Sequence, residues 1–285
     1  MDFNLHRLEA LLTQEGFPFN NPQEKRLTNQ TSSLFKLHGF ETVASTNETL
    51  WQLIEQGADE GTVVLALQQH AGRGQWGREW RSPPGGLYLS LALTPNLPAE
   101  ISRQLTLCTC WGIATALRAY EIPVSLKWPN DLVAQGRKLG GILLETRLRQ
   151  GRIHRAIAGV GINWRNPVPS TGITVQTLMM ERSQPTIDSL EMLAAIVLAG
   201  LMKGYRDWQN QGIDFLLPSY QDLLINLGQP INVNGNSGVI TGVSATGELV
   251  VRVDLDNRAS TTKDVFLQPG EVSLGYVSSG TESCS

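Results

Sequence analysis

The chain has 285 residues, of which 41% are hydrophobic and 17% are charged, and its 26 acidic against 23 basic residues leave a formal net charge of −3. This composition is typical of a folded globular protein, and the length predicts one large domain with a smaller one beside it. The acidic balance, without a long Lys/Arg run, argues against a general nucleic-acid surface. No stretch stays apolar for the ~18 residues that a spanning helix needs, so we expect a cytoplasmic protein without a membrane segment.

The three cysteines are Cys108, Cys110 and Cys284. Their spacing matches neither a zinc-binding pair nor a disulfide framework. Cys108 and Cys110 fall in an apolar pattern of helical period, which favours core packing over reactivity. We therefore expect reduced thiols.

The first part of the chain predicts an extension followed by a mixed α/β domain. Residues 1–35 are too few for an independent core and contain a short helix around residues 5–15. From Phe40 onward, strand and helix patterns alternate. The apolar spacing of residues 101–120 predicts a helix packed on the sheet. The predicted strands are residues 62–67, 87–93, 124–128, 132–134, 139–148 and 153–163.

The second part predicts a long helix and then a small β module. Residues 188–191 resemble a capping box with Asp188 as the N-cap, and an apolar stripe continues to Trp208. Short strands with tight turns in fewer than sixty residues then imply a small barrel or sandwich. We expect domains at residues 36–227 and 228–277, with a tail at 278–285. The predicted short strands are residues 230–233, 238–243, 248–255, 259–267 and 272–276.

A loop rich in glycine and arginine, Gly72-Arg73-Gly74-Gln75-Trp76-Gly77-Arg78-Glu79-Trp80, is the most informative segment. Glycines let backbone N–H groups approach an anion, and guanidinium groups add charge and forked hydrogen bonding. Such a loop alone is also typical of a solvated surface. Further motifs accompany it in order: Ser45-Thr46-Asn47, Ser82 to Leu91, Lys127-Trp128-Pro129-Asn130-Asp131, Lys138-Leu139-Gly140-Gly141 and Gly159-Val160-Gly161-Ile162-Asn163.

In this order and spacing, the segment from Ser45 to Asn163 resembles the biotin–protein ligase family, also called biotin–[acetyl-CoA-carboxylase] ligase. The resemblance implies an α/β (α+β) fold: a mixed sheet with flanking helices, like the catalytic domain of class II aminoacyl-tRNA synthetases, and a C-terminal SH3-like barrel. Some members carry an N-terminal winged helix-turn-helix that reads DNA. Residues 1–35 are too short for that module, so we expect the monofunctional type.

The resemblance implies that ATP activates biotin to biotinyl-5′-AMP, which then modifies a lysine of a biotin carboxyl carrier protein, an acetyl-CoA carboxylase subunit. The activation must bring a carboxylate and a phosphate together despite their repulsion. Fixed cations and backbone donors can do this, and Mg²⁺ is expected to neutralise the pyrophosphate. Arg73, Arg78, Lys127 and Lys138 are the candidate cations. The residues that would bind the metal stay unknown.

The resemblance also assigns residues to the site. Lys138 and Arg73 are the expected catalytic residues, although spacing alone would make Lys138 a solvated turn residue. Trp80 and Trp128 could wall the pocket or stack on adenine, with Trp128 the better candidate. The nucleotide and metal region would include Trp128, Asn130, Asp131 and Asn163. Biotin or biotinyl-AMP would contact Ser45, Thr46, Asn47, Gln69, Gly72, Arg73, Gly74, Gln75, Arg78, Trp80, Lys138, Gly141, Gly159 and Ile162.

Several of these residues also have structural explanations. Ser45 and its neighbours could cap a helix, and Asn130 with Asp131 could form a turn after Pro129. Glycines at 140, 141, 159 and 161 fit either a nearby ligand or tightly packed elements. Family members often have arginine where this chain has Gln75, which keeps hydrogen bonding but loses the charge.

Three alternatives stay open. A lipoate or octanoate ligase of related fold would need a longer apolar tunnel. A biotin-responsive DNA-binding regulator is disfavoured by the acidic balance, and a non-enzymatic biotin-storage protein would release no pyrophosphate. A homodimer is one possible assembly, and the sequence does not give the oligomeric state.

Overall fold

The computed structural model describes residues 3–14, 34–180, 186–254 and 262–276. An eight-stranded mixed sheet forms its centre, in the order β1-β2-β3-β8-β7-β6-β5, with β4 also paired to β8. Only β1 and β2 are parallel; the other neighbours are antiparallel. The strands are β1 (Lys36–Val43), β2 (Thr62–Gln69), β3 (Leu87–Leu93), β4 (Leu97–Pro98), β5 (Ser125–Lys127), β6 (Asp131–Ala134), β7 (Arg137–Arg149) and β8 (Arg152–Ile162).

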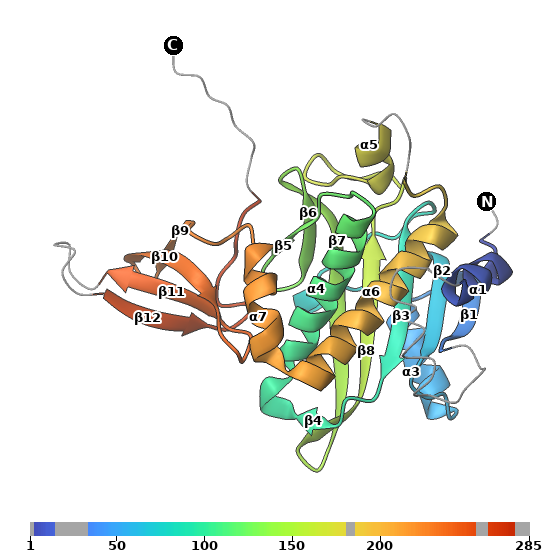
Figure 1. The fold of residues 1–285 in the computed structure, drawn as a ribbon, viewed down its shortest axis with the longest axis horizontal. Helices are drawn as coiled ribbons and strands as arrows, with labels where there is room; N and C mark the ends of the chain where they lie inside the picture. The colour runs from blue at the N-terminus through green and yellow to red at the C-terminus, as the bar shows by residue number, and fades with distance from the viewer. Residues whose placement is uncertain (1–2, 15–33, 181–185, 255–261, 277–285) are drawn as a thin grey trace.

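Helices cover both faces of this sheet. Along β2, Val63 and Leu65 pack into the main core, whereas Val64 points to the other face, as the two-residue period of a strand requires. Helices α4 (Arg103–Ala119) and α6 (Leu190–Gln211) lie over the main-core face, in front of the sheet in Figure 1. Helix α3 (Thr46–Glu55) packs on the opposite face through Leu50. The predicted mixed sheet with flanking helices is confirmed.

Close packing of α4 against α6 depends on glycine. A Cβ atom added to Gly112 would lie 2.2 Å from the carbonyl oxygen of Gly200 and 2.9 Å from Gly204. The cysteines predicted to pack in the core do so: Cys108 and Cys110 are buried in α4, and burial raises the pKa of the Cys108 thiol to about 12. Cys284 lies outside the described residues.

Helix α1 (Leu5–Thr13) packs on α6. Leu8 is fully buried in the main core, and the backbone N–H of Asn4 donates to Glu191 Oε1 at 2.8 Å. The described part of the predicted extension is therefore integrated into the large domain.

The C-terminal part forms a second, antiparallel sheet in the order β12-β11-β10-β9, to the left of α7 (Ile213–Asp222) in Figure 1. Its strands are β9 (Pro230–Val233), β10 (Asn236–Val243), β11 (Leu249–Asp254) and β12 (Thr262–Leu267). Within the described ranges, β9 and β12 do not pair with each other, so this sheet is open. Its apolar side chains join the main core, and the buried indole N–H of Trp128 donates to the Gly247 carbonyl.

Two predictions about local structure were wrong. The N-cap of α6 is Ser189, whose side chain accepts from the N–H of Met192, while Asp188 pairs with Arg7. Residues 272–276 form no strand. A turn at residues 270–271 precedes them, in which Gly270 has a φ of 100°, and Pro269 before it cannot donate a backbone hydrogen bond to a sheet. Elements that the sequence did not predict are β1, β4, α7 and the short η1 (Gln75–Gly77), η2 (Ala99–Ile101) and α5 (Val175–Met180).

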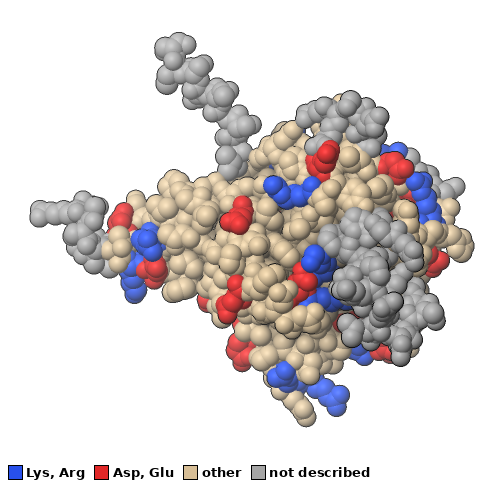
Figure 2. Space-filling model, in the orientation of Figure 1, with Lys and Arg blue, Asp and Glu red and all other residues tan. Residues whose placement is uncertain are grey.

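Charged side chains are interspersed on the face that Figure 2 shows, where basic and acidic groups lie close to one another. Within the described residues, no helix combines the length and the apolar character that crossing a membrane requires. The predicted tail, residues 278–285, lies outside the described ranges.

Candidate active site

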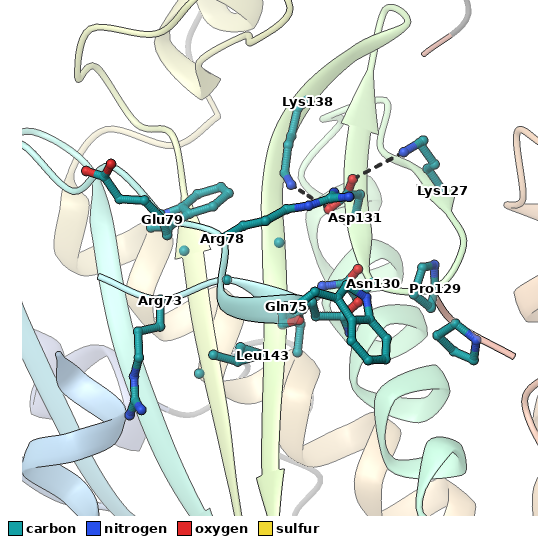
Figure 3. A pocket seen from close by; sticks show the side chains of 18 of the residues that line it. Arg73, Gln75, Arg78, Glu79, Lys127, Pro129, Asn130, Asp131, Lys138 and Leu143 are labelled. Carbon is teal, nitrogen blue, oxygen red and sulfur yellow. Dashed lines mark hydrogen bonds and ion pairs between the residues drawn. The ribbon is translucent and has the colours of Figure 1, made fainter. Parts of the chain in front are cut away.

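A cavity of about 890 Å³ opens between the glycine–arginine loop, the hairpin strands β5 to β8 and the segment 269–276 that follows β12. Its lining combines neutral polar groups, charged groups and apolar side chains, among them Trp76, Trp80 and Trp128. Ligand cavities typically occupy about 300–1,000 Å³, so the volume of this cavity lies at the upper end of that range and suits a large ligand. Figure 3 shows side chains from these elements converging on it.

One end of the cavity, hereafter the neutral end, is built by Ser45, Thr46, Asn47 and Gln69. Ser45 occupies the N-cap position of α3 without a capping side-chain bond. Gln69 Oε1 instead accepts from the Thr46 backbone N–H at 2.8 Å, so a neighbouring strand satisfies the helix terminus.

Asn47 carries an unsatisfied donor at the neutral end. Ser90 Oγ donates to Asn47 Oδ1 at 2.6 Å, which fixes the side-chain amide. Among the described residues, the buried Nδ2 of Asn47 has no hydrogen-bond partner. Because an unpaired buried donor costs about 1–3 kcal/mol, this N–H group is suited to a carbonyl oxygen supplied by a ligand.

The other end, hereafter the cationic end, is centred on Asp131. Its Oδ1 lies 2.7 Å from Lys138 Nζ and its Oδ2 lies 3.6 Å from Lys127 Nζ. Arg78 extends toward the same carboxylate (Figure 3). Burial lowers the pKa of Lys127, and the negative charge of Asp131 opposes that shift. Three cations around one carboxylate leave an excess of positive charge, which favours binding of an anion.

The strand register brings these charges together. The β5–β6 hairpin places Lys127 opposite Asp131, and β6 in turn places Asp131 opposite Gly141. The tight turn before β7 uses Gln135 and Gly136, both with positive φ, and leads directly to Lys138. Residues that the sequence indicated as one group therefore do converge.

Two glycines of β8 make room for protein side chains. A Cβ atom on Gly159 would lie 2.2 Å from Asn47 Oδ1, and one on Gly161 would lie 2.4 Å from Trp80 Nε1. Gly141 differs, because a Cβ there would meet Asp131, Lys138 and Trp80 at ordinary distances of 3.5–3.6 Å. Its open side faces the cationic end.

Arg73 points away from Asp131 in Figure 3, unlike Arg78. Its guanidinium pairs with Glu145 Oε1 at 3.3 Å, and Glu145 Oε2 accepts from the indole N–H of Trp51 at 2.7 Å. The structure therefore gives the expected catalytic arginine a partner outside the cationic end. Glu145 was not singled out from the sequence, because nothing local marks its contact with Arg73.

Three expected site residues do not border the cavity. A Cβ on Gly72 would lie 2.3 Å from the Trp80 carbonyl oxygen, so its close approach is to the loop itself. Ile162 is fully buried in the core. Asn163 donates to the Lys138 carbonyl at 3.2 Å and accepts from Asn166, which ties β8 to the segment that carries Lys138.

Of the two tryptophans that could wall the cavity, the structure favours Trp80 over the expected Trp128. Trp128 borders the cavity, but its side chain is 2% exposed and its N–H is satisfied by Gly247, so it chiefly packs. The Nζ atom of Lys138 lies 5.1 Å from the centre of the Trp80 ring, over its face. The buried Nε1 of Trp80 has no hydrogen-bond partner among the described residues. Trp80 is therefore the better candidate for a wall of the cavity.

The segment 269–276 contributes lining residues that the sequence did not predict, including Tyr276, whose hydroxyl donates to Asp131 Oδ2 at 2.7 Å. Trp76 in the loop has φ of 61° and packs close to Gly270. The remaining expected residues, Gly74, Gln75 and Asn130, border the cavity.

The residues present fit Mg²⁺ only as a partner of bound phosphates. Within the described ranges, no group of three or more His, Cys, Asp or Glu side chains could hold a metal ion. The side-chain oxygens of Asp131 and Asn130 are nonetheless hard donors at the cavity. Proteins commonly bind Mg²⁺ through one or two carboxylates together with substrate phosphates and water, which this donor set allows.

Comparisons with known proteins agree with this architecture. Residues 39–163 match the Biotin/lipoate A/B protein ligase family. The bifunctional ligase/repressor BirA of Salmonella typhimurium is 30% identical over 219 residues, covering 74% of this chain and 68% of that protein. The biotin protein ligase of Aquifex aeolicus, in a structure with biotin and ATP, is 26% identical with a TM-score of 0.61, covering 81% of this chain and 99% of that one.

The BirA protein of Bacillus spizizenii is also 30% identical, over 207 residues and 71% of this chain. The present chain spans 63% of that relative's length. The alignment at 30% identity covers 68% of the Salmonella protein, and together with the shared fold it identifies the family. The chain belongs to the biotin/lipoate A/B protein ligase family.

Proposed function

We propose that this protein is an ATP-dependent biotin–protein ligase that forms biotinyl-5′-AMP and transfers biotin to a lysine of a carrier protein. The main observation in support is that the cavity has two chemically different ends. The unpaired N–H of Asn47 lies at the neutral end, and Lys127, Lys138 and Arg78 lie at the cationic end. A ligand with a cyclic urea at one end and a carboxylate at the other matches this division.

The neutral end can recognise the ureido ring of biotin. Its carbonyl needs a donor, which Asn47 offers, and its N–H groups need acceptors, which hydroxyl and amide oxygens of Ser45, Thr46 and Gln69 offer. A lipoyl or octanoyl chain would leave these groups unpaired. Buried polar groups without partners disfavour a ligand strongly, so we propose biotin over lipoate.

The cationic end can support adenylation. An oxygen of the biotin carboxylate attacks the α-phosphorus of ATP, the bond to the bridging oxygen breaks, and pyrophosphate leaves. Lys138, Lys127 and Arg78 would stabilise the charge that develops on the phosphoryl oxygens. Mg²⁺, held by the phosphates with Asp131 and Asn130, would neutralise charge on the departing pyrophosphate.

In the second step, the neutral amine of a carrier lysine attacks the carbonyl carbon of the mixed anhydride, AMP leaves, and the nitrogen loses a proton. The products are an amide and AMP. We propose a biotin carboxyl carrier protein of acetyl-CoA carboxylase as the acceptor, on the strength of the family resemblance.

We further propose a catalytic domain at residues 36–227 and an SH3-like C-terminal domain at 228–277. The antiparallel order of β9 to β12 supports the latter. A cytoplasmic location suits an enzyme that uses ATP and a carboxylase subunit. We place α1 with the catalytic domain because Leu8 is buried in its core.

Release of pyrophosphate tests the first half-reaction. The chain is incubated with ATP–Mg²⁺ and either biotin, lipoate or no acid, and pyrophosphate is quantified. We expect release with biotin alone. Release with lipoate only would support the rival ligase, and binding of biotin with no pyrophosphate would support a storage protein.

A further inference from the structure

Tyr276 brings a phenol from the C-terminal segment into the cationic end. Its hydroxyl donates to Asp131 Oδ2 at 2.7 Å, and its ring lies 4.3 Å from Lys127 Nζ at the ring centre. These contacts join residues about 145 positions apart in the chain. The segment that carries Tyr276 also touches the glycine–arginine loop, where Gly270 packs against Trp76.

The carboxylate of Asp131 is divided between its partners. Lys138 takes Oδ1 at 2.7 Å, whereas Tyr276 takes Oδ2 at the same distance. Lys127 Nζ stands 3.6 Å from Oδ2, beyond hydrogen-bond distance. Tyr276 and Lys127 therefore share Oδ2, and the ion pair of Lys127 is the longer of the two lysine contacts with Asp131.

The ring of Tyr276 gives Lys127 a different support. An ammonium group over an aromatic face is attracted by the ring quadrupole while keeping its charge and N–H donors available. Lys127 is thus held at the cavity without being fully neutralised by Asp131. An incoming phosphate therefore meets a lysine whose contact with the carboxylate is longer than that of Lys138.

We propose that Tyr276 is a positioning residue for ATP: its hydroxyl keeps Asp131 from closing on Lys127, so that the Lys127 ammonium stays available to the triphosphate. This inference rests on the proposed function and deepens it. It assigns the C-terminal segment a direct part in arranging the cationic end. It also separates the hydroxyl, which restrains Asp131, from the ring, which supports Lys127.

The test compares Tyr276→Phe, which removes only the hydroxyl, with Tyr276→Ala, which also removes the ring. Tyr120→Phe is the matched control, because it deletes a phenol hydroxyl from a residue that does not line the cavity. Binding of ATP–Mg²⁺ and of biotin to the full chain is measured separately by calorimetry. KM values for both substrates come from pyrophosphate release, and thermal unfolding is followed in parallel.

We expect Tyr276→Phe to weaken ATP binding and raise its KM roughly tenfold, the size associated with a hydrogen bond to a charged group. Biotin binding and the unfolding midpoint should match wild type. Tyr276→Ala should weaken ATP binding at least as much, and Tyr120→Phe should change neither substrate.

ATP binding by Tyr276→Phe at the wild-type affinity would overturn the inference. Equal weakening of ATP and biotin binding, or a fall in stability that accounts for the loss, would also overturn it. Wild-type protein that binds ATP but releases no pyrophosphate with biotin would contradict the proposed function while the Tyr276 comparison still stands on binding. Wild-type protein that binds no ATP would contradict both.

Discussion

Lys138 is held between the carboxylate of Asp131 and the face of Trp80, so its ammonium stands at the cationic end of the cavity. Lys138→Gln keeps hydrogen-bonding capacity but removes the charge. Loss of one preorganised group that stabilises a transition state typically costs ~10²–10³-fold in rate, and we expect adenylation to fall by that factor. Pyrophosphate release measures it, with the exposed Lys36→Gln as the charge-matched control.

Lys36→Gln should keep the wild-type rate. If Lys138→Gln also released pyrophosphate at that rate, Lys138 would have no part in adenylation.

Gln75 borders the cavity at the position for which the family resemblance leads us to expect arginine. Each charge-assisted hydrogen bond to a phosphate or carboxylate contributes about 1.5–3 kcal/mol. Gln75→Arg should therefore slow the release of biotinyl-AMP and reduce stray biotinylation of bystander lysines. A chase of preformed labelled intermediate with unlabelled biotin and ATP gives the off-rate, and an unchanged value would mean that residue 75 does not retain the intermediate.

Gly141 and Gly159 make a matched pair. A methyl group on Gly141 meets only ordinary contacts, whereas one on Gly159 lies 2.2 Å from Asn47 Oδ1. We expect Gly141→Ala to keep the unfolding midpoint but to weaken biotinyl-AMP binding roughly tenfold or more, because the methyl enters the cavity. Gly159→Ala should lower both. Calorimetric binding and thermal unfolding distinguish them, and wild-type affinity in Gly141→Ala would refute this placement.

The sequence could indicate most of the residues that gather at the cavity, but not how each side chain is oriented. Asn47, Lys138 and Asp131 were predictable because their motifs are local. The partner of Arg73 was not, because Glu145 lies on β7, far away in the chain, and only the folded sheet brings the two together. Tyr276 was not predicted for the same reason, because its partner Asp131 lies 145 positions away in the chain.

At the scale of elements, period and capping residues predicted most of the central strands and the long helices. The N-cap of α6 was misplaced by one residue, because Asp188 and Ser189 are both good caps and Arg7, distant in the chain, engages Asp188. The short α5 and η1 carry too few residues to show a period. Residues 272–276 look like a strand by composition, but all of them except Gly275 line the cavity instead.

The contact between α4 and α6 offers a test at this scale. A methyl group on Gly112 would overlap the Gly200 carbonyl at 2.2 Å, and the backbone can relieve this only if the helices separate. We expect Gly112→Ala to lower the free energy of unfolding by about 1–3 kcal/mol despite the better helix propensity of alanine. Denaturant unfolding measures it.

Gly275→Ala is the control, since among the described residues no heavy atom beyond its chain neighbours lies within 4 Å of its added Cβ. Equal stability of the Gly112 variant and this control would show that the helices are not packed as closely as described.

For the molecule as a whole, the two sheets share one hydrophobic core, to which Val233, Leu249 and Val251 contribute from the C-terminal part. Deleting residues 228–285 would expose that core and remove the Gly247 acceptor from the buried Trp128 N–H, at a cost of about 1–3 kcal/mol for the N–H group alone. We expect the full chain to unfold in one calorimetric transition and the truncated chain to lose cooperative folding.

Two separate transitions in the full chain, or a truncated chain that melts cooperatively, would show that the C-terminal part is an independent unit. The sequence predicted short strands in this part but not that their apolar side chains join the main core, because no local pattern shows which apolar faces meet.

The most direct test of the proposed ligase activity is mass analysis of a carrier domain after incubation with the chain, biotin and ATP–Mg²⁺. We predict the addition of one biotinyl group to a single carrier lysine, with no addition when ATP is omitted or when lipoate replaces biotin. An unmodified carrier under conditions in which a known biotin–protein ligase modifies it, or a carrier that gains lipoate instead, would contradict the account.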